Sequence, residues 1–280
     1  MPEGHTIHRI ARDHSRLLVG APLRVSSPQG RFEHGASLLD GHTLARIDAY
    51  GKHLLYRFDD LTLHVHLGLF GKYRVHTPPV GHTGNGNGEA ADTLAYEPPA
   101  PVGAVRLRLC GPSTTIDLAG PTACELFDPP DEDRLLARLG PDPLRSDADP
   151  GHFHVRVARS RQAIGLLLMD QSVVAGIGNV FRAEALFVNG IHPDRPGSTL
   201  NAVERDELWT TVQAMLRQGV KDNRIVTVDP KEVGLARSKI TRPNATYVYK
   251  RDACRRCGTP ISRWDMGGRT CYACARCQAR

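Results

Sequence analysis

The chain has no long apolar runs, and most of its length has few cysteines. No stretch of eighteen consecutive apolar residues occurs in its 280 residues, which excludes a transmembrane helix. The first residues, MPEGHTIHRI, lack the apolar core of a signal peptide, which argues against secretion. The seven cysteines are odd in number and five lie in the last 27 residues, which does not suit a disulfide framework. We therefore expect a cytoplasmic protein of a reduced compartment, without membrane contact.

Composition and charge indicate a globular protein with a basic tail. Apolar residues make up 40% and charged residues 24%, as in ordinary folded domains. At roughly 150 residues per domain, the length suggests about two domains. Residues 241–280 hold nine Lys or Arg and two Asp or Glu, a formal net charge of +7, which exceeds the +6 of the whole chain. This tail is therefore a candidate surface for phosphate contacts.

The first part of the chain has the pattern of short strands. An amphipathic helix from Ile7 to Leu18 comes before them. The strand signals are partly alternating and cover Leu44–Tyr50, His53–Phe58, Leu61–Leu67, Ala104–Leu109 and Thr114–Leu118. Residues 78–103, rich in Pro, Gly and Asn, are predicted to form a mobile loop.

From about Pro129 the apolar periodicity becomes helical. Apolar stripes predict helices over Asp131–Leu139, Arg161–Gln171, Val180–Val188 and Ala202–Val220. Pro141–Gly151, rich in Pro and Asp, is predicted to be a linker. The predicted fold class is α+β with two domains, an N-terminal β-sandwich flanked by helices and a C-terminal helical domain that ends in the cysteine-rich tail.

Four cysteines of the tail have the spacing of a zinc site. Cys254-x2-Cys257 and Cys274-x2-Cys277 are separated by sixteen residues, which fits a four-thiolate zinc ribbon. Cys271 offers a competing register with Cys274, but the spacing favours the outer choice. We expect one structural Zn²⁺, because four protein ligands leave no open position for a substrate. Ordinary buried or free thiols are the alternative, which two C-x2-C pairs disfavour.

The segment Gln171–Asn179, QSVVAGIGN, places a glycine-bearing turn between two helical stripes. Asn179 stands where its side chain could cap the second helix. Such a turn presents backbone N–H groups at a helix N-terminus, which suits a phosphate. A helix hairpin with a capping Asn and no ligand fits the pattern equally well.

The N-terminus offers a nucleophile. Removal of the initiator Met would leave Pro2 with a free secondary amine, and an α-amine has a pKa of about 8, so part of it is unprotonated at neutral pH. Such an amine can attack an electrophilic sugar carbon and form an iminium ion, and Glu3 beside it could act as acid or base. The simpler interpretation is that Pro2 and Glu3 only start a helix.

Together these features resemble a known family. MPEG at the start, Gly51-Lys52, the AGIGN turn and a terminal zinc ribbon ending in Arg-Cys-Gln are similar to the formamidopyrimidine-DNA glycosylase/endonuclease VIII family of base-excision repair enzymes. The resemblance runs from Pro2 to Gln278, and LGPDPL at 139–144 looks like the family's connector. It implies a catalytic β-sandwich domain at 1–128, a helix–two-turn–helix DNA-binding domain at 129–240 and a zinc finger at 241–280.

The resemblance implies roles for the matching residues. Pro2 matches the nucleophile that attacks C1′ and displaces the base, and Glu3 matches the carboxylate that assists proton transfer at the sugar. Lys52 matches a lysine that assists catalysis and contacts phosphate. Asn179 matches the phosphate-binding Asn, and Arg269 matches the zinc-finger arginine that grips the phosphates flanking the lesion. Without the resemblance, Lys52 and Arg269 could be solvated surface charges.

The resemblance also implies apolar side chains that fill the gap left in the duplex by the extruded base. The enzyme must extrude the target base from the duplex, and apolar side chains can fill the gap. In HLGLFG at 66–71, Leu69 matches the family's intercalating position and Phe70 is its neighbour at the gap. Judged from the pattern alone, both would pack in the core at a strand end.

Two features favour the endonuclease VIII branch. The chain begins PEG rather than PEL, and LAGPTAC at 118–124 lacks the Arg and Phe of the second void-filling loop of the other branch. This branch implies oxidised pyrimidines as substrates, with β,δ-elimination after base removal. His5 and Thr6 stand where family members commonly have Pro-Glu, which removes a carboxylate from the pocket region.

Three functions are therefore compared. The leading one is a bifunctional DNA glycosylase with AP-lyase activity, a monomer in a bacterial-type cytosol that acts on double-stranded DNA with a damaged base or an abasic site. The second is a DNA-lesion or abasic-site binding module on the same fold, with lyase activity only or no catalysis. The third is an RNA- or ribosome-associated zinc-ribbon protein, which leaves Pro2 and Glu3 unexplained.

Overall fold

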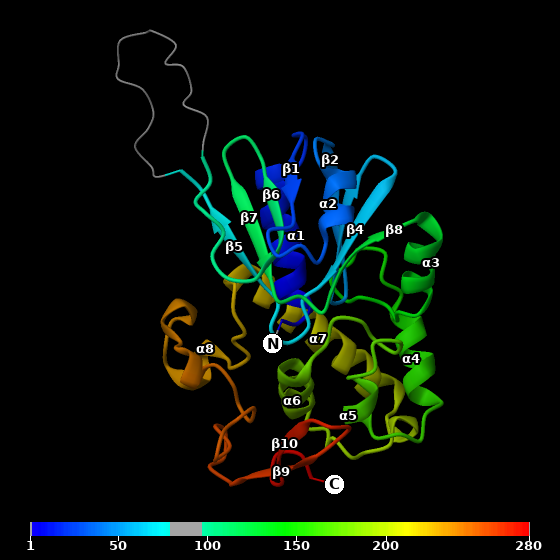
Figure 1. The fold of residues 1–280 in the computed structure, drawn as a ribbon. Helices are drawn as coiled ribbons and strands as arrows, with labels where there is room; N and C mark the ends of the chain where they lie inside the picture. The colour runs from blue at the N-terminus through cyan, green and yellow to red at the C-terminus, as the bar shows by residue number, and fades with distance from the viewer. Residues whose placement is uncertain (1, 79–96, 280) are drawn as a thin grey trace. The chain divides into compact units, whose positions relative to one another are not determined.

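The computed structural model describes residues 2–78 and 97–279, so most of the predicted loop at 78–103 lies outside the described residues. The chain divides into two compact units. The first contains Pro2 and Ile10–Arg134, and the second contains Glu3–Arg9 and the chain from Leu135 onward. Helix α1 (Gly4–Leu18) supplies residues to both units (Figure 1). Among the described residues, no helix is both long and apolar enough to cross a bilayer.

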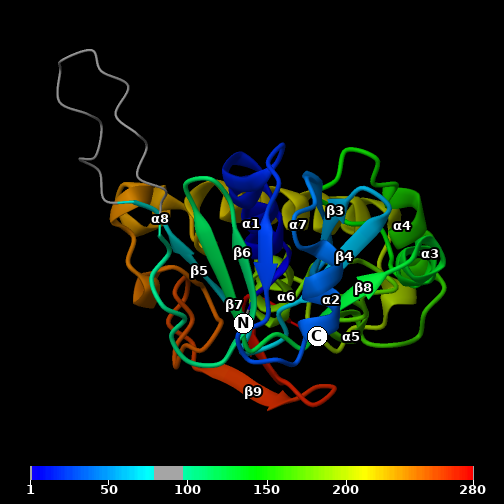
Figure 2. The same cartoon turned by 45° about the horizontal axis from the view of Figure 1, so that its top comes forward.

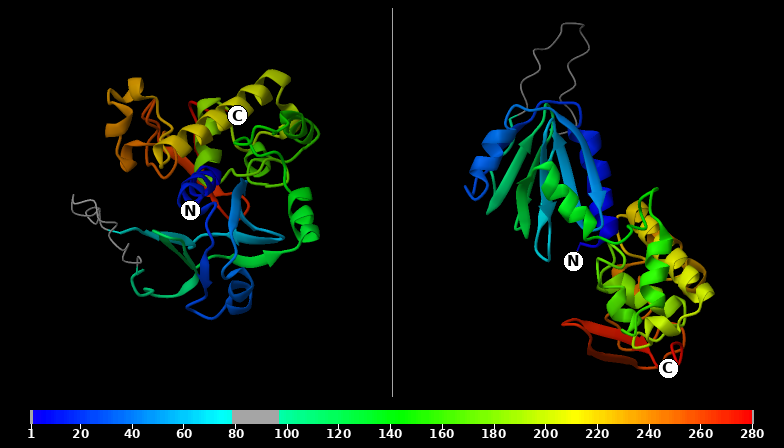
Figure 3. Two further views of the ribbon diagram at one scale, coloured as in Figure 1. Left: turned by 90° about the horizontal axis from the view of Figure 1, so that it is seen from above. Right: turned by 90° about the vertical axis from the view of Figure 1, so that its right-hand side faces the viewer.

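The first unit is built on two four-stranded antiparallel sheets (Figures 2 and 3). One sheet has the order β1 (Arg24–Ser26), β6 (Val105–Cys110), β7 (Thr115–Ala119) and β5 (Lys72–His76). The other has the order β2 (Leu44–Tyr50), β3 (His53–Phe58), β4 (Leu61–His66) and β8 (Ala123–Phe127). Helix α2 (Glu33–Leu39) and the part of α3 (Pro129–Ala137) up to Arg134 complete the unit. The predicted β-sandwich flanked by helices is confirmed.

The core of the first unit is mainly apolar but also contains a buried chain of polar groups that spans both sheets. Tyr56 of β3 donates its hydroxyl to the Tyr73 hydroxyl of β5 at 3.0 Å, and His14 Nδ1 of α1 lies 2.8 Å from the Tyr56 hydroxyl. Tyr56 and His14 are buried, and burial raises the pKa of both tyrosines. Because the two tyrosines come from different sheets, this chain of hydrogen bonds fixes how the sheets pack.

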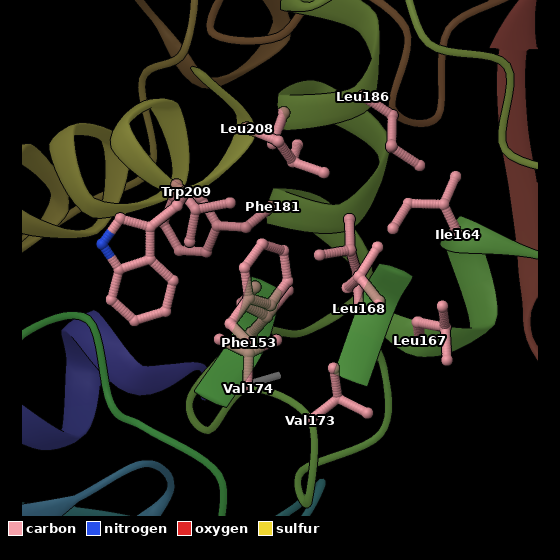
Figure 4. Close-up of a cluster of buried hydrophobic side chains, with 14 of the residues drawn as sticks. Phe153, Ile164, Leu167, Leu168, Val173, Val174, Phe181, Leu186, Leu208 and Trp209 are labelled. Carbon is pink, nitrogen blue, oxygen red and sulfur yellow. The ribbon is translucent and has the colours of Figure 1, made fainter. Parts of the chain in front are cut away.

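The second unit is mainly helical. It contains α4 (Pro150–Ala158), α5 (Ile164–Leu167), α6 (Asn179–Val188) and α7 (Ala202–Asp222). Figure 4 shows their shared core, in which Phe153 of α4, Phe181 of α6 and Trp209 of α7 gather. Asn201 caps α7 by accepting from the Glu204 N–H at 3.0 Å, and the Glu204 side chain accepts from the Asn201 N–H.

The remaining elements of the second unit are short. They are η1 (Gly197–Thr199), α8 (Pro230–Val233), η2 (Arg237–Lys239), η3 (Arg242–Asn244), β9 (Ile261–Asp265) and β10 (Thr270–Cys274). The β9–β10 hairpin, red in Figure 3, contributes Tyr272 and Cys274 to a second apolar cluster that includes Phe187, Tyr247 and Val248. Because α6 contributes to both clusters, it is the central helix of the unit.

Two predicted elements of this part were wrong. The helix predicted over Arg161–Gln171 is reduced to Ile164–Leu167. It starts late because the N–H groups of Ile164 and Gly165 donate to the loop carbonyls of Arg195 and Pro193. The predicted linker Pro141–Gly151 is packed at its start. Asp142 is buried there and lies 2.6 Å from His8, so the segment is anchored rather than free.

Candidate active site and DNA-binding surface

Glu3 is bound to the N-terminus of α6. Its carboxylate accepts hydrogen bonds from the N–H groups of Gly178 at 3.0 Å, Val180 at 3.0 Å and Phe181 at 3.4 Å. The Glu3 side chain is fully buried. The helix has no side-chain cap of its own, so Glu3 satisfies donors that would otherwise be left open. These donors and the helix dipole stabilise a negative charge at this position.

The glycines of the AGIGN turn are explained by this contact. A Cβ on Gly178 would lie 2.4 to 2.6 Å from atoms of the Glu3 side chain. The Gly4 N–H donates to the Gly176 carbonyl at 2.7 Å, and a Cβ on Gly4 would meet Gly176 at 3.0 Å. The N-terminal segment and the turn therefore approach too closely for side chains between them.

The structure corrects the prediction that backbone N–H groups of this turn are available to bind a phosphate. The three N–H groups at the start of α6 bind Glu3, so they are not offered to a phosphate. The N-cap of α6 is Gly178, and Asn179 is the first residue of the helix rather than its cap. The Asn179 side chain instead donates from Nδ2 to the Thr270 carbonyl at 3.0 Å, and its Oδ1 accepts from Arg182 Nη2 at 2.5 Å.

Arg269 lies at the tip of the β9–β10 hairpin. The tip turns through Gly267 at φ 64° and Gly268 at φ 72°, and the Met266 N–H donates to the Arg269 carbonyl at 3.0 Å. Arg269 is half-buried and precedes Thr270, whose carbonyl binds Asn179. Arg263 of the same hairpin lies on β9 and is ion-paired with Asp252 at 2.5 Å. The structure thus gives Arg269 and Arg263 different surroundings, although composition does not distinguish them.

The four predicted cysteine ligands come together. The sulfur atoms of Cys254, Cys257, Cys274 and Cys277 all lie within 4.8 Å of one another and could hold a metal ion. The Sγ–Sγ distances are 3.4 Å for Cys257–Cys274 and 3.9 Å for Cys254–Cys277. A tetrahedral site with Zn–S bonds of about 2.3 Å requires sulfurs about 3.8 Å apart, so the donor set fits Zn²⁺. Cys271 is buried outside this group.

In the first unit, Pro2 and Lys52 are half-buried. Pro2 lies two residues before the start of α1, and Lys52 lies in the turn that joins β2 to β3, after Gly51 at φ 57°. Lys52 lies near His66 at the end of β4. Burial lowers the pKa of His66, and the neighbouring charges of His64 and Lys52 lower it further.

Leu69 and Phe70 form an exposed apolar tip between β4 and β5. Leu69 is 53% exposed and Phe70 83% exposed, so neither packs in the core as the pattern alone would suggest. Gly68 at φ 64° would clash with Thr122 if it had a Cβ, and a Cβ on Gly71 would lie 2.3 Å from the Leu67 carbonyl. The two glycines therefore fix a tight turn that presents both apolar side chains outward.

Comparison with known proteins places these residues in a family. The family model described as the formamidopyrimidine-DNA glycosylase N-terminal domain matches residues 1–109, and the one described as the formamidopyrimidine-DNA glycosylase H2TH domain matches residues 139–229. "Endonuclease 8 1" of Mycobacterium tuberculosis is 43% identical over 282 residues, which covers 99% of this chain and 100% of that protein. The chain belongs to the formamidopyrimidine-DNA glycosylase/endonuclease VIII family. Members of this family are DNA glycosylases with AP-lyase activity.

Further relatives agree. The formamidopyrimidine-DNA glycosylase of Geobacter metallireducens is 31% identical over 290 residues, covering 99% of this chain and 100% of that protein. A solved complex of the Lactococcus lactis protein Fpg with DNA containing an abasic site shares the fold, with a TM-score of 0.77 and 24% identity over 99% of this chain and 100% of that one. The predicted fold class and family resemblance are therefore confirmed.

Sequence reasoning missed several buried polar residues. Glu184 is fully buried and accepts from the Thr227 hydroxyl at 2.5 Å and from the N–H groups of Tyr247 at 2.7 Å, Val248 at 2.9 Å and Tyr249 at 2.8 Å. Burial raises the pKa of Glu184, and these donors oppose the rise. Glu184 therefore fixes the segment that leads into the cysteine cluster. Its signal in the sequence was an acid inside an apolar helical stripe.

Sequence reasoning also did not assign buried contacts to two further residues, Gln278 and His5. Gln278 is fully buried, donates to the Ile191 carbonyl at 2.9 Å and accepts from the Cys274 N–H at 3.0 Å, so it joins the cysteine cluster to the loop after α6. His5 is buried with its ring edge-on to Phe181, 5.1 Å between centroids. Burial lowers the pKa of His5 to about 4, with a contribution from the charge of Arg9. A packed histidine is thus the correct interpretation of this position.

Proposed function

We propose that the protein is a bifunctional DNA glycosylase and AP lyase of base-excision repair, with Pro2 as nucleophile. The observation that carries the proposal is the fixation of Glu3. A glutamate that only started α1 would favour its own helix, whereas this one is fully buried and bound to the N-terminus of α6. The residue beside Pro2 is therefore held in place by the segment that bears the family's AGIGN turn.

The chemistry follows from a secondary amine. After removal of Met1, the Pro2 nitrogen attacks C1′ of the damaged nucleotide, and the bond from C1′ to the base breaks as the base leaves with a proton. Opening of the sugar gives an iminium ion between Pro2 and C1′. Loss of a C2′ proton then expels the 3′ phosphate by β-elimination, a second elimination expels the 5′ phosphate, and water releases Pro2. We assign proton transfer at the sugar to Glu3 and phosphate contact during these steps to Lys52.

DNA binding is assigned to both units. We assign contacts with backbone phosphates to Asn179 and Arg269; Asn179 donates to the carbonyl of Thr270, the residue after Arg269. We assign the filling of the space left by the extruded base to Leu69 and Phe70, which are exposed. The domain division at residues 128 and 240 belongs to the same proposal. The DNA partner is a double strand with a damaged base or an abasic site, bound by a monomer.

We assign the cysteine cluster to one structural Zn²⁺. Cys254, Cys257, Cys274 and Cys277 would hold it with four thiolates, and the bound ion would stabilise the hairpin that carries Arg269. It supplies no chemistry at the reacting sugar carbon, because four protein ligands complete its coordination.

We infer oxidised pyrimidines as the preferred substrates. Support comes from the higher identity to the protein named Endonuclease 8 1, 43% against 31% for a formamidopyrimidine-DNA glycosylase. It also comes from the short connection between β7 and β8. That connection has only the three residues Gly120, Pro121 and Thr122, which leaves no room for a second void-filling loop.

The test uses end-labelled duplexes that carry thymine glycol, 5-hydroxyuracil, 8-oxoguanine or an abasic site. We expect cleavage of the two pyrimidine lesions and of the abasic site, with phosphate left on both sides of the gap. Faster cleavage at 8-oxoguanine would overturn the pyrimidine assignment. Binding without cleavage of any duplex would overturn the enzyme proposal and favour a lesion-binding module.

A further inference from the structure

Arg182 is a buried arginine that forms no salt bridge with a carboxylate in the part of the chain that the structure describes. It is the largest of the side chains that the described structure buries completely. Its Nη2 donates to Asn179 Oδ1 at 2.5 Å and to the Thr270 carbonyl at 3.2 Å. Its Nε and Nη1 have no hydrogen-bond partner within residues 2–78 and 97–279. A buried charge without an ionic partner destabilises a fold, so stability alone does not explain Arg182.

The guanidinium determines which way the Asn179 amide faces. An arginine can only donate hydrogen bonds, so the amide must turn its oxygen toward Arg182. The Asn179 nitrogen then faces the Thr270 carbonyl, to which it donates at 3.0 Å. A side-chain amide has two N–H donors, so this geometry leaves the second one for another acceptor. Replacing Arg182 would allow the amide to rotate and to present its oxygen instead.

Arg182 also positions the hairpin tip. The Thr270 carbonyl accepts from both Arg182 and Asn179, and Thr270 directly follows Arg269. Burial lowers the pKa of Arg182, and the charge of Arg269 lowers it further, while Cys271 and Glu3 favour the charged form. A buried positive charge and a half-buried one thus lie near each other, which favours an anion beside them.

We propose that Arg182 is a positioning residue for a DNA phosphate, which it serves by orienting the Asn179 amide, fixing the hairpin tip that bears Arg269, and adding a positive charge that the phosphate balances. The inference rests on the proposed function, because it takes Asn179 and Arg269 as phosphate-binding residues. Arg182 itself is fully buried and is not assigned a direct contact with DNA.

The experiment measures binding without chemistry. The probe is a duplex with a tetrahydrofuran abasic analogue, which no elimination can cleave, and its Kd is measured by fluorescence anisotropy between about 50 and 200 mM salt. The variants are Arg182→Met, Arg182→Lys, Asn179→Ala and the double variant Arg182→Met with Asn179→Ala. Arg217→Met is the matched control, because Arg217 is an exposed arginine of α7 in the same unit. Thermal unfolding of each variant is recorded in parallel.

We expect Arg182→Met to weaken binding roughly 10- to 100-fold and to make the slope of log Kd against log salt less steep by up to about one. Asn179→Ala should weaken binding without changing the slope, because it removes no charge. The double variant should bind about as weakly as the weaker single variant. Arg182→Lys should keep the wild-type slope. The Tm of Arg182→Met should not fall, because methionine replaces a buried charge with an apolar side chain.

A purely structural role makes different predictions. It would lower the Tm of Arg182→Met, leave the salt slope unchanged and make the two single effects multiply in the double variant. Those results would overturn the proposal. Wild-type protein that binds this duplex but forms no covalent adduct with an abasic site would refute the Pro2 chemistry and leave the Arg182 test valid. Wild-type protein that does not bind the duplex would overturn both proposals.

Discussion

The contact between Glu3 and the start of α6 predicts a specific effect of Gly178→Ala. The backbone of Gly178, at φ −126° and ψ −166°, is extended, so alanine fits it without strain. The new Cβ, however, would lie 2.4 to 2.6 Å from the Glu3 side chain, where no stable contact exists. Glu3 must therefore leave the N–H groups of Gly178, Val180 and Phe181.

The size of the effect can be worked from these bonds. A hydrogen bond to a charged group contributes about 1.5–3 kcal/mol, and a lost helix cap costs about 1 kcal/mol. Since the three bonds share one carboxylate and are not additive, we expect Gly178→Ala to lower the free energy of unfolding by about 2–4 kcal/mol. For a unit of this size the Tm should fall by about 5–15 °C.

A double-mutant cycle isolates the contact. The four proteins are wild type, Gly178→Ala, Glu3→Ala and the double variant, each measured by urea and thermal unfolding. With Glu3 truncated, the alanine Cβ has room, so Gly178→Ala should then cost no more than about 1 kcal/mol, the preference of an N-cap for glycine over alanine. An equal cost of Gly178→Ala in both backgrounds would refute the reasoning, because the clash would then be with some other group.

Three further predictions concern residues of the second unit. Glu184→Gln should lower the free energy of unfolding by about 3–5 kcal/mol, since one amide oxygen cannot accept hydrogen bonds from four donors. The control is Glu207→Gln at an exposed position, and a urea midpoint of Glu184→Gln equal to that of the control would contradict this prediction. His5 has a folded pKa of about 4, below its ordinary 6.5, so its contribution is present above about pH 6.5 and is lost as the pH falls toward 4. His5→Phe should remove up to about 3 kcal/mol of this acid sensitivity, and a parallel pH profile would exclude His5 as its source. Replacing Cys254 and Cys257 with serine should release one zinc per chain, which metal analysis measures. The replacement should weaken DNA binding while the first unit stays folded. Full DNA binding by the metal-free protein would exclude the zinc assignment.

Much of the fold could be predicted because local signals agreed with the final structure. Strands at Leu44–Tyr50 and His53–Phe58 have the predicted bounds, since alternation and the Gly51-Lys52 turn define both ends. The cysteine cluster was predictable because each C-x2-C pair places two sulfurs on one ion regardless of the rest of the chain. The predicted helix over Arg161–Gln171 was too long, because the bonds that fix the start of α5 at Ile164 come from a loop about thirty residues away.

The site was less predictable, because its contacts are distant in sequence. No local pattern indicates that Glu3 binds N–H groups about 175 residues later, or that these groups are therefore closed to phosphate. Arg182 and Glu184 could have been singled out, since two charges in an apolar stripe mark a helix buried on all sides. Their partners, the Thr270 carbonyl and the 247–249 backbone, still required the structure.

The central claim is that Pro2 forms the covalent bond to DNA, and borohydride trapping tests it most directly. Wild-type protein and Pro2→Gly are each incubated with an abasic duplex and with a thymine glycol duplex, reduced, and digested for peptide mass mapping. The account predicts an adduct on both duplexes for the wild type, with the sugar remnant on the N-terminal peptide that begins at Pro2, and little or none for Pro2→Gly. An adduct on Lys52, or an equal yield from Pro2→Gly, would contradict it.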